Sequence, residues 1–241
     1  MNLTLDIGNT RIKWAIFDGP RLADQGVTDA PQLVALVHRL TWSRAAVCAS
    51  GEADLSPLLD TGRPVHRLAA DSPLPITLDY ATPQTLGPDR IAAACGAWAL
   101  FPGTDCIIID AGTCITIDHL DASGTYRGGA ILPGIEMKFH ALHTFTARLP
   151  LLEQIDGSAA PVTGRTTAES ILAGVLTATR FAVEGFVQHY RSRCASARVL
   201  LTGGDAARLC VAGAPALQHA EQLPSLVMTG LNSILTELNI Q

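Results

Sequence analysis

The chain has 241 residues, of which 48% are hydrophobic and 16% charged, and its formal net charge is −5. This composition is typical of a globular protein with enough chain for one large or two small domains. The acidic balance gives no support for a surface that binds nucleic acid. No basic leader opens the sequence, and no apolar run approaches the roughly 20 residues that span a bilayer. We therefore expect a cytoplasmic protein without a membrane partner.

The six cysteines predict buried thiols and no zinc site. None forms a Cys-x-x-Cys pair, and most lie in apolar stretches, as Cys48 and Cys106 do. Metal-site spacing is therefore missing, and small buried hydrophobic residues in a reducing compartment are the better interpretation.

The start of the chain predicts a β-hairpin. Apolar residues alternate with polar ones over residues 2–7 and again over 12–17, which is the period of a strand. Gly8-Asn9 supplies the turn, since both residues tolerate the positive φ that tight hairpins need.

The tip of this hairpin carries groups that suit a phosphate. Gly8 lets the backbone approach an anion, and Thr10 offers a hydroxyl. Lys13 supplies a cation, and Asp6 is a hard oxygen ligand for Mg²⁺ carried on the phosphates. Taken alone, the stretch fits an ordinary solvated turn about equally well.

The same design returns at residues 107–118. An apolar strand leads to Asp110, a small residue, Gly112 and Thr113, and alternation then resumes. Two such hairpins predict a duplicated unit whose tips face each other across a cleft. Facing phosphate hairpins resemble those of the acetate and sugar kinase, heat-shock protein and actin superfamily. The resemblance implies two related α/β domains of the ribonuclease H-like, actin-like ATPase fold, each with a mixed sheet and with the nucleotide in the cleft between them.

A proline-rich stretch, residues 54–88, predicts loops and ends in Gly87-Pro88-Asp89-Arg90 before a helix over 91–101. Asp89 at the helix start fits an N-cap, worth about 1 kcal/mol. It also fits a general base, with Arg90 pairing an anionic group of a substrate.

The remaining elements follow from periodicity and turn residues. Thr202-Gly203-Gly204 after a buried strand fits either a plain turn or bare backbone against an adenine or ribose. In the helix over 135–146 we expect Met137, Leu142 and Phe145 in the core. Further strands are expected at 21–27, 44–49, 126–132 and 198–201, and further helices at 31–40, 167–191 and 225–238.

Five motifs in order then resemble the type III pantothenate kinase family over nearly the whole chain. They are Asp6–Thr10 with Lys13, Gly87–Arg90, Asp110–Thr113, Gly128–Gly134 and Thr146–Pro150.

The resemblance implies a role for each matching position. Asp89 would be the proton acceptor, and Asp110 would bind a monovalent cation, K⁺ or NH₄⁺, beside ATP with Mg²⁺. The pantothenate pocket would be lined by Tyr80, Gly87, Pro88, Asp89 and Arg90. A threonine of the partner subunit in a homodimer would complete it, Thr167 in preference to Thr166. ATP would be bound by Asp6, Ile7, Gly8, Asn9, Thr10, Arg11, Ile12, Lys13, Thr113, Gly203 and Gly204.

We thus expect an N-terminal domain over 1–105, a C-terminal domain over 106–241 and a last helix that packs back on the first. The expected function is ATP-dependent phosphorylation of pantothenate to 4′-phosphopantothenate. Two alternatives remain: a kinase for another small alcohol, and a non-catalytic nucleotide-binding regulator of the same fold. ATP binding without turnover would distinguish the regulator.

Overall fold

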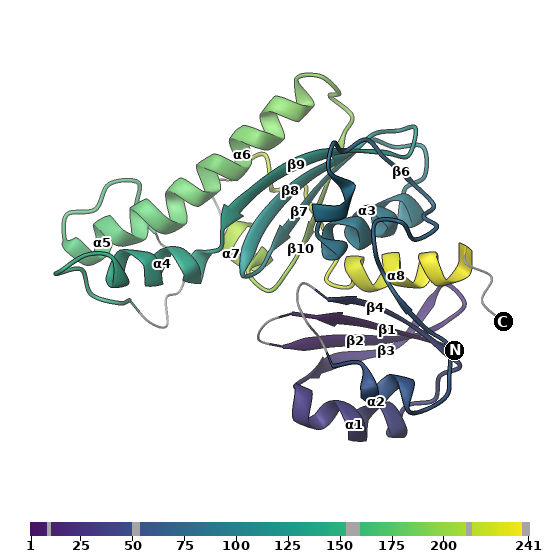
Figure 1. Cartoon of the computed structure of the whole chain (residues 1–241). Helices are drawn as coiled ribbons and strands as arrows, with labels where there is room; N and C mark the ends of the chain where they lie inside the picture. Colours follow the sequence, from purple (N-terminus) through teal and green to yellow (C-terminus); the bar gives the residue numbers. More distant parts are fainter. Residues whose placement is uncertain (9–10, 50–53, 153–159, 211–213, 238–241) are drawn as a thin grey trace. The chain divides into compact units, whose positions relative to one another are not determined.

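The computed structural model describes residues 1–8, 11–49, 54–152, 160–210 and 214–237 (Figure 1). The chain divides into two compact units, each formed by separate stretches of sequence. The first comprises Met1–Thr104, Leu120–Arg127 and Ser225–Gln241, and the second comprises Asp105–His119 and Gly128–Pro224.

The first unit is built on a five-stranded mixed sheet with the order β3-β2-β1-β4-β5. The central strand β1 pairs antiparallel with β2 and parallel with β4. The strands predicted at 21–27 and 44–49 are confirmed. The strand bounds are β1 (Asn2–Ile7), β2 (Ile12–Asp18), β3 (Arg21–Thr28), β4 (Arg44–Ala49) and β5 (Val65–Arg67).

Helices cover both faces of this sheet (Figure 1). Leu3 and Leu5 of β1 join a core with α1, while Asn2 on the other face donates to Asn232 Oδ1 of α8 at 2.7 Å. Asn2 and Thr4, two polar residues of the alternating pattern, are therefore buried and hydrogen-bonded. The helices of this unit are α1 (Ala30–Arg39), α2 (Ser56–Leu59), α3 (Pro88–Leu100) and α8 (Leu226–Glu237).

Two glycines let α3 and α8 cross in close contact. A Cβ on Gly230 would lie 1.8 Å from the Ala92 carbonyl oxygen, and one on Gly96 would lie 2.3 Å from that of Leu226. Side chains at these positions would force the helices apart. Because α8 is covered by both the sheet and α3, it is buried on more than one side.

The second sheet has six strands in the order β11-β10-β7-β8-β9-β6. Its isoleucine-rich strands β7 and β8 supply the core of the second unit. The short strand β6 and the first residues of β9 belong to the first unit. The strands are β6 (Thr77–Leu78), β7 (Cys106–Ala111), β8 (Cys114–Leu120), β9 (Thr125–Pro133), β10 (Arg198–Thr202) and β11 (Glu221–Gln222).

The long helix predicted at 167–191 is present, but a π-helical turn divides it. It consists of α5 (Thr167–Leu172), the π-turn (Ala173–Thr177) and α6 (Ala178–Arg191). Within the described ranges it is the one helix long and apolar enough to cross a membrane, and half of its apolar window is buried inside the protein. The core helix of a folded domain has the same character. The other helices of this unit are α4 (Ile135–Thr144) and α7 (Ala206–Leu209).

Two detailed predictions were wrong. Met137 is 40% exposed and Phe145 is 85% exposed, because α4 buries Ile135 and Phe139, packs Leu142 partly buried against the same core, and ends before Phe145. The first hairpin is not closed by a two-residue turn: Ile7 pairs with Ile12, so four residues separate the strands, and Gly8 has no positive φ.

Candidate active site

The first hairpin gathers three polar side chains at the carboxyl end of β1. Asp6 is the register partner of Lys13 on β2 and of Cys48 on β4, so one neighbour flanks it on each side. Lys13 Nζ lies 3.8 Å from Asp6 Oδ2, and Cys48 Sγ donates to Asp6 Oδ1 at 3.4 Å. The carboxylate is thus held by one cationic and one neutral partner.

Burial raises the pKa of Asp6 above its ordinary value. The Lys13 ammonium and the Cys48 thiol lower this pKa in part, and the negative charge of Asp89 raises it again. Burial also raises the pKa of the Cys48 thiol, so Cys48 remains a protonated donor. A carboxylate whose charged form is disfavoured gains from an added cation.

The donor set fits Mg²⁺ carried by a nucleotide. In the described part of the chain, no cluster of three or more His, Cys, Asp or Glu side chains could hold a metal ion. Mg²⁺ commonly uses one or two carboxylates together with substrate phosphates and water. Asp6 can serve as such a single carboxylate.

The loop that follows Asp6 is closed by a backbone hydrogen bond from Gly8 N to Arg11 O at 3.1 Å. Ile7 and Ile12, at the ends of the two strands, flank this loop. Asn9 and Thr10, which the sequence predicts as phosphate ligands, lie outside the described residues.

The start of α3 carries the predicted base. The N-cap is Gly87, so the alternative that Asp89 is the N-cap is wrong by position: Asp89 lies in the first turn of the helix. Its Oδ1 still accepts from Arg90 N at 2.9 Å. A Cβ on Gly87 would lie 2.5 Å from Asp89 Oδ1, so the glycine leaves room for the carboxylate. Asp89 also influences the pKa of Asp6 through its charge, which places both acids in one electrostatic environment.

Tyr80 and Arg90 both lie beside the ring of Tyr126, a residue that no sequence motif marks as part of the site. The buried ring of Tyr126 lies 6.1 Å from that of Tyr80, with 55° between the ring planes. The Arg90 guanidinium carbon lies 5.9 Å from the centroid of the same ring. Tyr126 therefore joins two of the predicted substrate residues, although they come from different elements.

In the second unit, Asp110 is the next-to-last residue of β7 and pairs in register with Thr202 of β10. The next residue, Gly203, has a φ of +94°, and a Cβ there would lie 2.5 Å from Asp110 Oδ1 and 2.3 Å from Ala111 O. Only glycine fits against the carboxylate at this point. Asp110 and Gly203, predicted for cation and nucleotide, are thus in direct contact.

Asp205 continues this loop and is tied to α4. Asp205 N donates to Ala111 O at 2.9 Å. Arg208 lies 3.3 Å from the Asp205 carboxylate and 2.5 Å from that of Glu136. Burial raises the pKa of Asp205, which Arg208 lowers in part. No sequence motif predicted the pairing of Asp205 with Arg208.

The second hairpin tip consists of Gly112 and Thr113, between β7 and β8. Gly112 N donates to Cys114 O at 2.9 Å, and Gly134 N donates to Thr113 O at 3.1 Å. A Cβ on Gly134 would lie 2.3 Å from Thr113 O. The start of α4 therefore packs directly on the tip, which explains the glycine at this position.

The two neighbouring threonines differ in their bonds. Thr166 is the N-cap of α5, and its Oγ1 accepts from Glu169 N at 3.2 Å. Thr167 is the first residue of the helix and is exposed. Because the cap occupies the Thr166 hydroxyl, Thr167 is the better candidate to contact a ligand.

The sequence matches the family model of type III pantothenate kinase over residues 2–189. The type III pantothenate kinase of Cytophaga hutchinsonii is 40% identical over 213 residues, covering 86% of this chain and 87% of that protein. That of Flavobacterium johnsoniae is 35% identical over 246 aligned positions, covering 99% of this chain and 96% of that protein.

Solved structures share the fold at lower identity. A Campylobacter jejuni protein described as a Baf family transcriptional activator superimposes with a TM-score of 0.67 at 22% identity, covering 98% of both chains. A Sinorhizobium meliloti protein described as a 2-dehydro-3-deoxygalactonokinase gives 0.61 at 13% identity, covering 100% of both. Together with the two mixed sheets, these similarities confirm the predicted α/β, actin-like class.

Proposed function

The chain belongs to the type III pantothenate kinase family, and from this premise we propose how its own residues carry out the reaction. The enzyme transfers a phosphoryl group from ATP to pantothenate and forms 4′-phosphopantothenate, the first step of coenzyme A biosynthesis. Such a transfer requires positioning of both substrates, neutralisation of phosphate charge and a group that accepts the hydroxyl proton.

We assign the phosphates of ATP to the first hairpin. Lys13 and the backbone of the loop from Ile7 to Ile12 would neutralise and orient them, with Asn9, Thr10 and Arg11 as further contacts. The Lys13–Asp6 pair at 3.8 Å supports this assignment, because it sets a cation and a carboxylate side by side at a strand end. When bound, Mg²⁺ on the phosphates would neutralise charge on the transferring group, and Asp6 would be its protein ligand.

Asp89 would accept the proton of the attacking primary hydroxyl. Its support is the position in the first turn of α3 together with the electrostatic link to Asp6. Arg90 would pair the pantothenate carboxylate, which a guanidinium can bind through two hydrogen bonds. Tyr80, Gly87 and Pro88 would complete the lining.

Asp110 would hold the monovalent cation, K⁺ or NH₄⁺, with Thr113 on the ATP phosphates and Gly203-Gly204 against the nucleoside. The close packing of Gly203 on the Asp110 carboxylate supports a shared role for these residues. Carboxylate oxygen is a suitable ligand for such ions.

We further propose a homodimer formed through the second unit, in the cytoplasm. Large apolar side chains are exposed on this unit, with Phe145 at 85%, Val162 at 72% and Phe181 at 54%. A cavity of about 410 Å³, lined by residues of α4 and the π-turn, lies beside Phe145. Exposed apolar surface of this kind is typical of an interface with a second copy. Thr167 of each subunit would then reach the substrate of the other.

The observation that carries the proposal is the pairing of Lys13 with Asp6 at the carboxyl end of β1, where Lys13 Nζ lies 3.8 Å from Asp6 Oδ2. The test is phosphate transfer from ATP to pantothenate by the purified protein, measured in K⁺ and in Na⁺. We expect turnover in K⁺ that collapses in Na⁺. No product in either salt, with ATP still bound, would contradict the proposed reaction.

The same assay tests the base. Asp89→Asn should lower kcat by about 10²–10⁴-fold, the range for a general base. Asp54→Asn is the matched control, because Asp54 is an exposed acid of the same unit outside the site. An Asp89→Asn rate equal to that of the control would leave Asp89 with a structural role alone.

A further inference from the structure

Two residues assigned to the pantothenate pocket come from separate parts of the first unit. Tyr80 follows the two-residue strand β6, and Arg90 lies in the first turn of α3. A short strand and a helix start do not fix each other's position through local structure. Something else must keep the two side chains at a constant spacing.

Tyr126 contacts both. Its ring is fully buried, lies 6.1 Å from the ring of Tyr80, and lies under the Arg90 guanidinium at 5.9 Å. A tilted aromatic pair and a cation over an aromatic face are both favourable contacts. One ring thus restrains a phenol on one side and a guanidinium on the other.

The backbone under Tyr126 is registered as well. β6 runs parallel to β9 with Leu78 opposite Tyr126, and Asp79 N donates to Tyr126 O at 3.0 Å. Tyr80 therefore directly follows Asp79, whose backbone is hydrogen-bonded to that of Tyr126.

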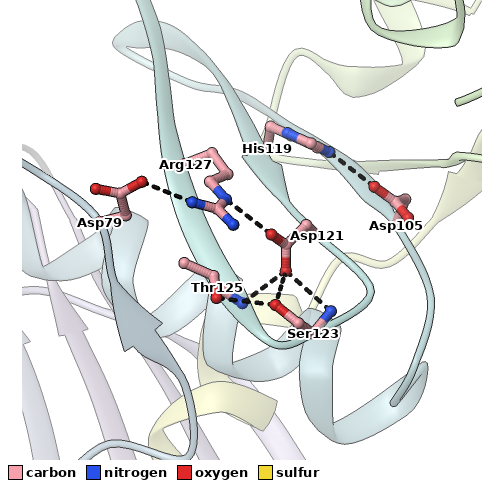
Figure 2. A network of polar contacts seen from close by, with 7 residues as sticks. All are labelled: Asp79, Asp105, His119, Asp121, Ser123, Thr125 and Arg127. Carbon is pink, nitrogen blue, oxygen red and sulfur yellow. Dashed lines mark hydrogen bonds and ion pairs between the residues drawn. The ribbon is translucent and has the colours of Figure 1, made fainter. Parts of the chain in front are cut away.

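A polar clamp holds this register from the solvent side (Figure 2). Arg127 Nη1 lies 2.7 Å from Asp79 Oδ2, and Arg127 Nε lies 2.7 Å from Asp121 Oδ2. The other oxygen of Asp121 accepts from Ser123 N, Ser123 Oγ and Thr125 N, at 2.9, 2.6 and 3.0 Å. The turn before β9 is thereby fixed to the segment that leads to Tyr80.

We propose that Tyr126 is a positioning residue for pantothenate recognition, setting the spacing between Tyr80 and Arg90. The inference rests on the proposed function. Tyr126 does not touch the substrate itself, because its ring has no exposed surface. It acts through the two residues that it contacts, and the clamp around Arg127 supports it from the outside.

The test compares Tyr126→Leu with Tyr126→Phe in steady-state kinetics. Removal of the ring in Tyr126→Leu should raise the KM for pantothenate by about 10-fold and leave the KM for ATP within about 2-fold, since loss of about 1.4 kcal/mol is one factor of ten. Tyr126→Phe keeps the ring and should restore the KM for pantothenate to within about 3-fold of the wild type.

Phe17→Leu is the control for general loss of packing, because Phe17 is 1% exposed and lies on β2 in the same unit. Both leucine variants should lose stability, but only Tyr126→Leu should change the pantothenate KM. Should Tyr126→Leu not fold, Arg127→Gln loosens the clamp from the surface and should raise the same KM by about 3-fold.

An unchanged pantothenate KM in the folded variants, or an equal rise in Phe17→Leu, would overturn the inference. Wild-type turnover in the same experiment keeps this outcome separate from the proposed function. A wild type that fails to phosphorylate pantothenate would contradict the proposed function instead.

Discussion

The hairpin after Asp6 and the hairpin after Asp110 share one strand arrangement. In each unit, a strand whose next-to-last residue is an aspartate has its hairpin partner on one side and a parallel strand on the other. Asp6 near the end of β1 has Cys48 opposite it on the parallel strand β4, and Asp110 near the end of β7 has Thr202 opposite it on β10. The position of the acid is therefore repeated along with the fold.

The surroundings of the two acids differ. Asp6 is contacted by side chains, the Lys13 ammonium and the Cys48 thiol. Asp110 is packed against the backbone of Gly203, where no side chain fits. The repeated strand arrangement determines where each carboxylate lies, and the neighbouring groups determine which ligand it suits. We propose phosphate-bound Mg²⁺ for the first and a monovalent ion for the second.

The largest expected effect separates these two roles. Asp6→Asn should lower kcat by about 10²–10³-fold, in K⁺ and Na⁺ alike, because the proposed protein ligand of the Mg²⁺ on the transferring phosphate is lost. Asp110→Asn should also lower the rate and, in addition, abolish the difference between K⁺ and Na⁺. Turnover measured in both salts gives the answer. Equal losses with an unchanged salt ratio in both variants would show that the tips are not divided in this way.

A second prediction concerns the glycine against Asp110. Gly203→Ala should reduce the free energy of unfolding by about 2–4 kcal/mol, because the new Cβ meets backbone at 2.3 Å in a left-handed conformation. Gly204→Ala is the matched control: a Cβ there meets nothing within 4 Å, so the change should stay within about 0.5 kcal/mol. Urea unfolding of both variants tests this. Similar losses in the two would contradict the close packing.

The smallest expected effect is the change in the free energy of unfolding caused by Asp6→Asn, and its sign is the prediction. The pKa of Asp6 is raised in the folded state, so its favourable contribution is present below the unfolded value of 3.8 and is lost as the pH rises through the folded value. At pH 7 the buried, charged carboxylate of Asp6 therefore destabilises the folded state. Asp6→Asn removes this charge and should be slightly more stable than the wild type at pH 7 without nucleotide or metal. Urea unfolding at pH 7 and at about pH 3.5 should show the gain only at pH 7.

Asp121 provides a control of opposite sign. Burial disfavours its charge, but bonds from Ser123, Thr125 and Arg127 outweigh it and lower the pKa of Asp121 to about 2. The stabilisation of the fold by the Asp121 carboxylate is present above pH 3.8 and is lost as the pH falls through about 2. Asp121→Asn should cost about 1–2 kcal/mol at pH 7, less than the full linkage value because the group is partly solvated. Equal signs for Asp6→Asn and Asp121→Asn would refute the Asp6 argument.

Local patterns predicted the longer strands, whereas the resemblance implied the fold class, and the short strands β5, β6 and β11 were not predicted. The alternation at residues 2–7 and 12–17 and the apolar runs at 44–49 and 198–201 each correspond to a strand. Such periodicity depends only on neighbouring residues. The same kind of pattern placed Phe145 in the core, but this side chain is 85% exposed because α4 ends at Thr144, and the spacing of apolar residues does not fix where a helix ends.

The candidate site shows the same limit. Asp6, Lys13, Asp89 and Asp110 stand in motifs and could be chosen from the sequence. Cys48 and Tyr126 could not, because their importance comes from register and ring contacts between distant segments. Cys48 in particular looks like any small buried residue until β4 aligns it with Asp6.

The π-turn in the long helix keeps its buried residues closer to one face of the helix. Buried residues recur every four positions along this helix, at Ile171, Val175, Thr179, Val183 and Val187. In an uninterrupted α-helix such a repeat would drift by about 40° at each step and about 160° over four steps, to the opposite face. The π-turn Ala173–Thr177 contains one residue more than an α-helical turn, and this residue reduces the drift by about 100°. Deleting a residue there would turn α5 about its own axis by the same amount, so the direction of the Thr167 hydroxyl is encoded downstream of Thr167 itself.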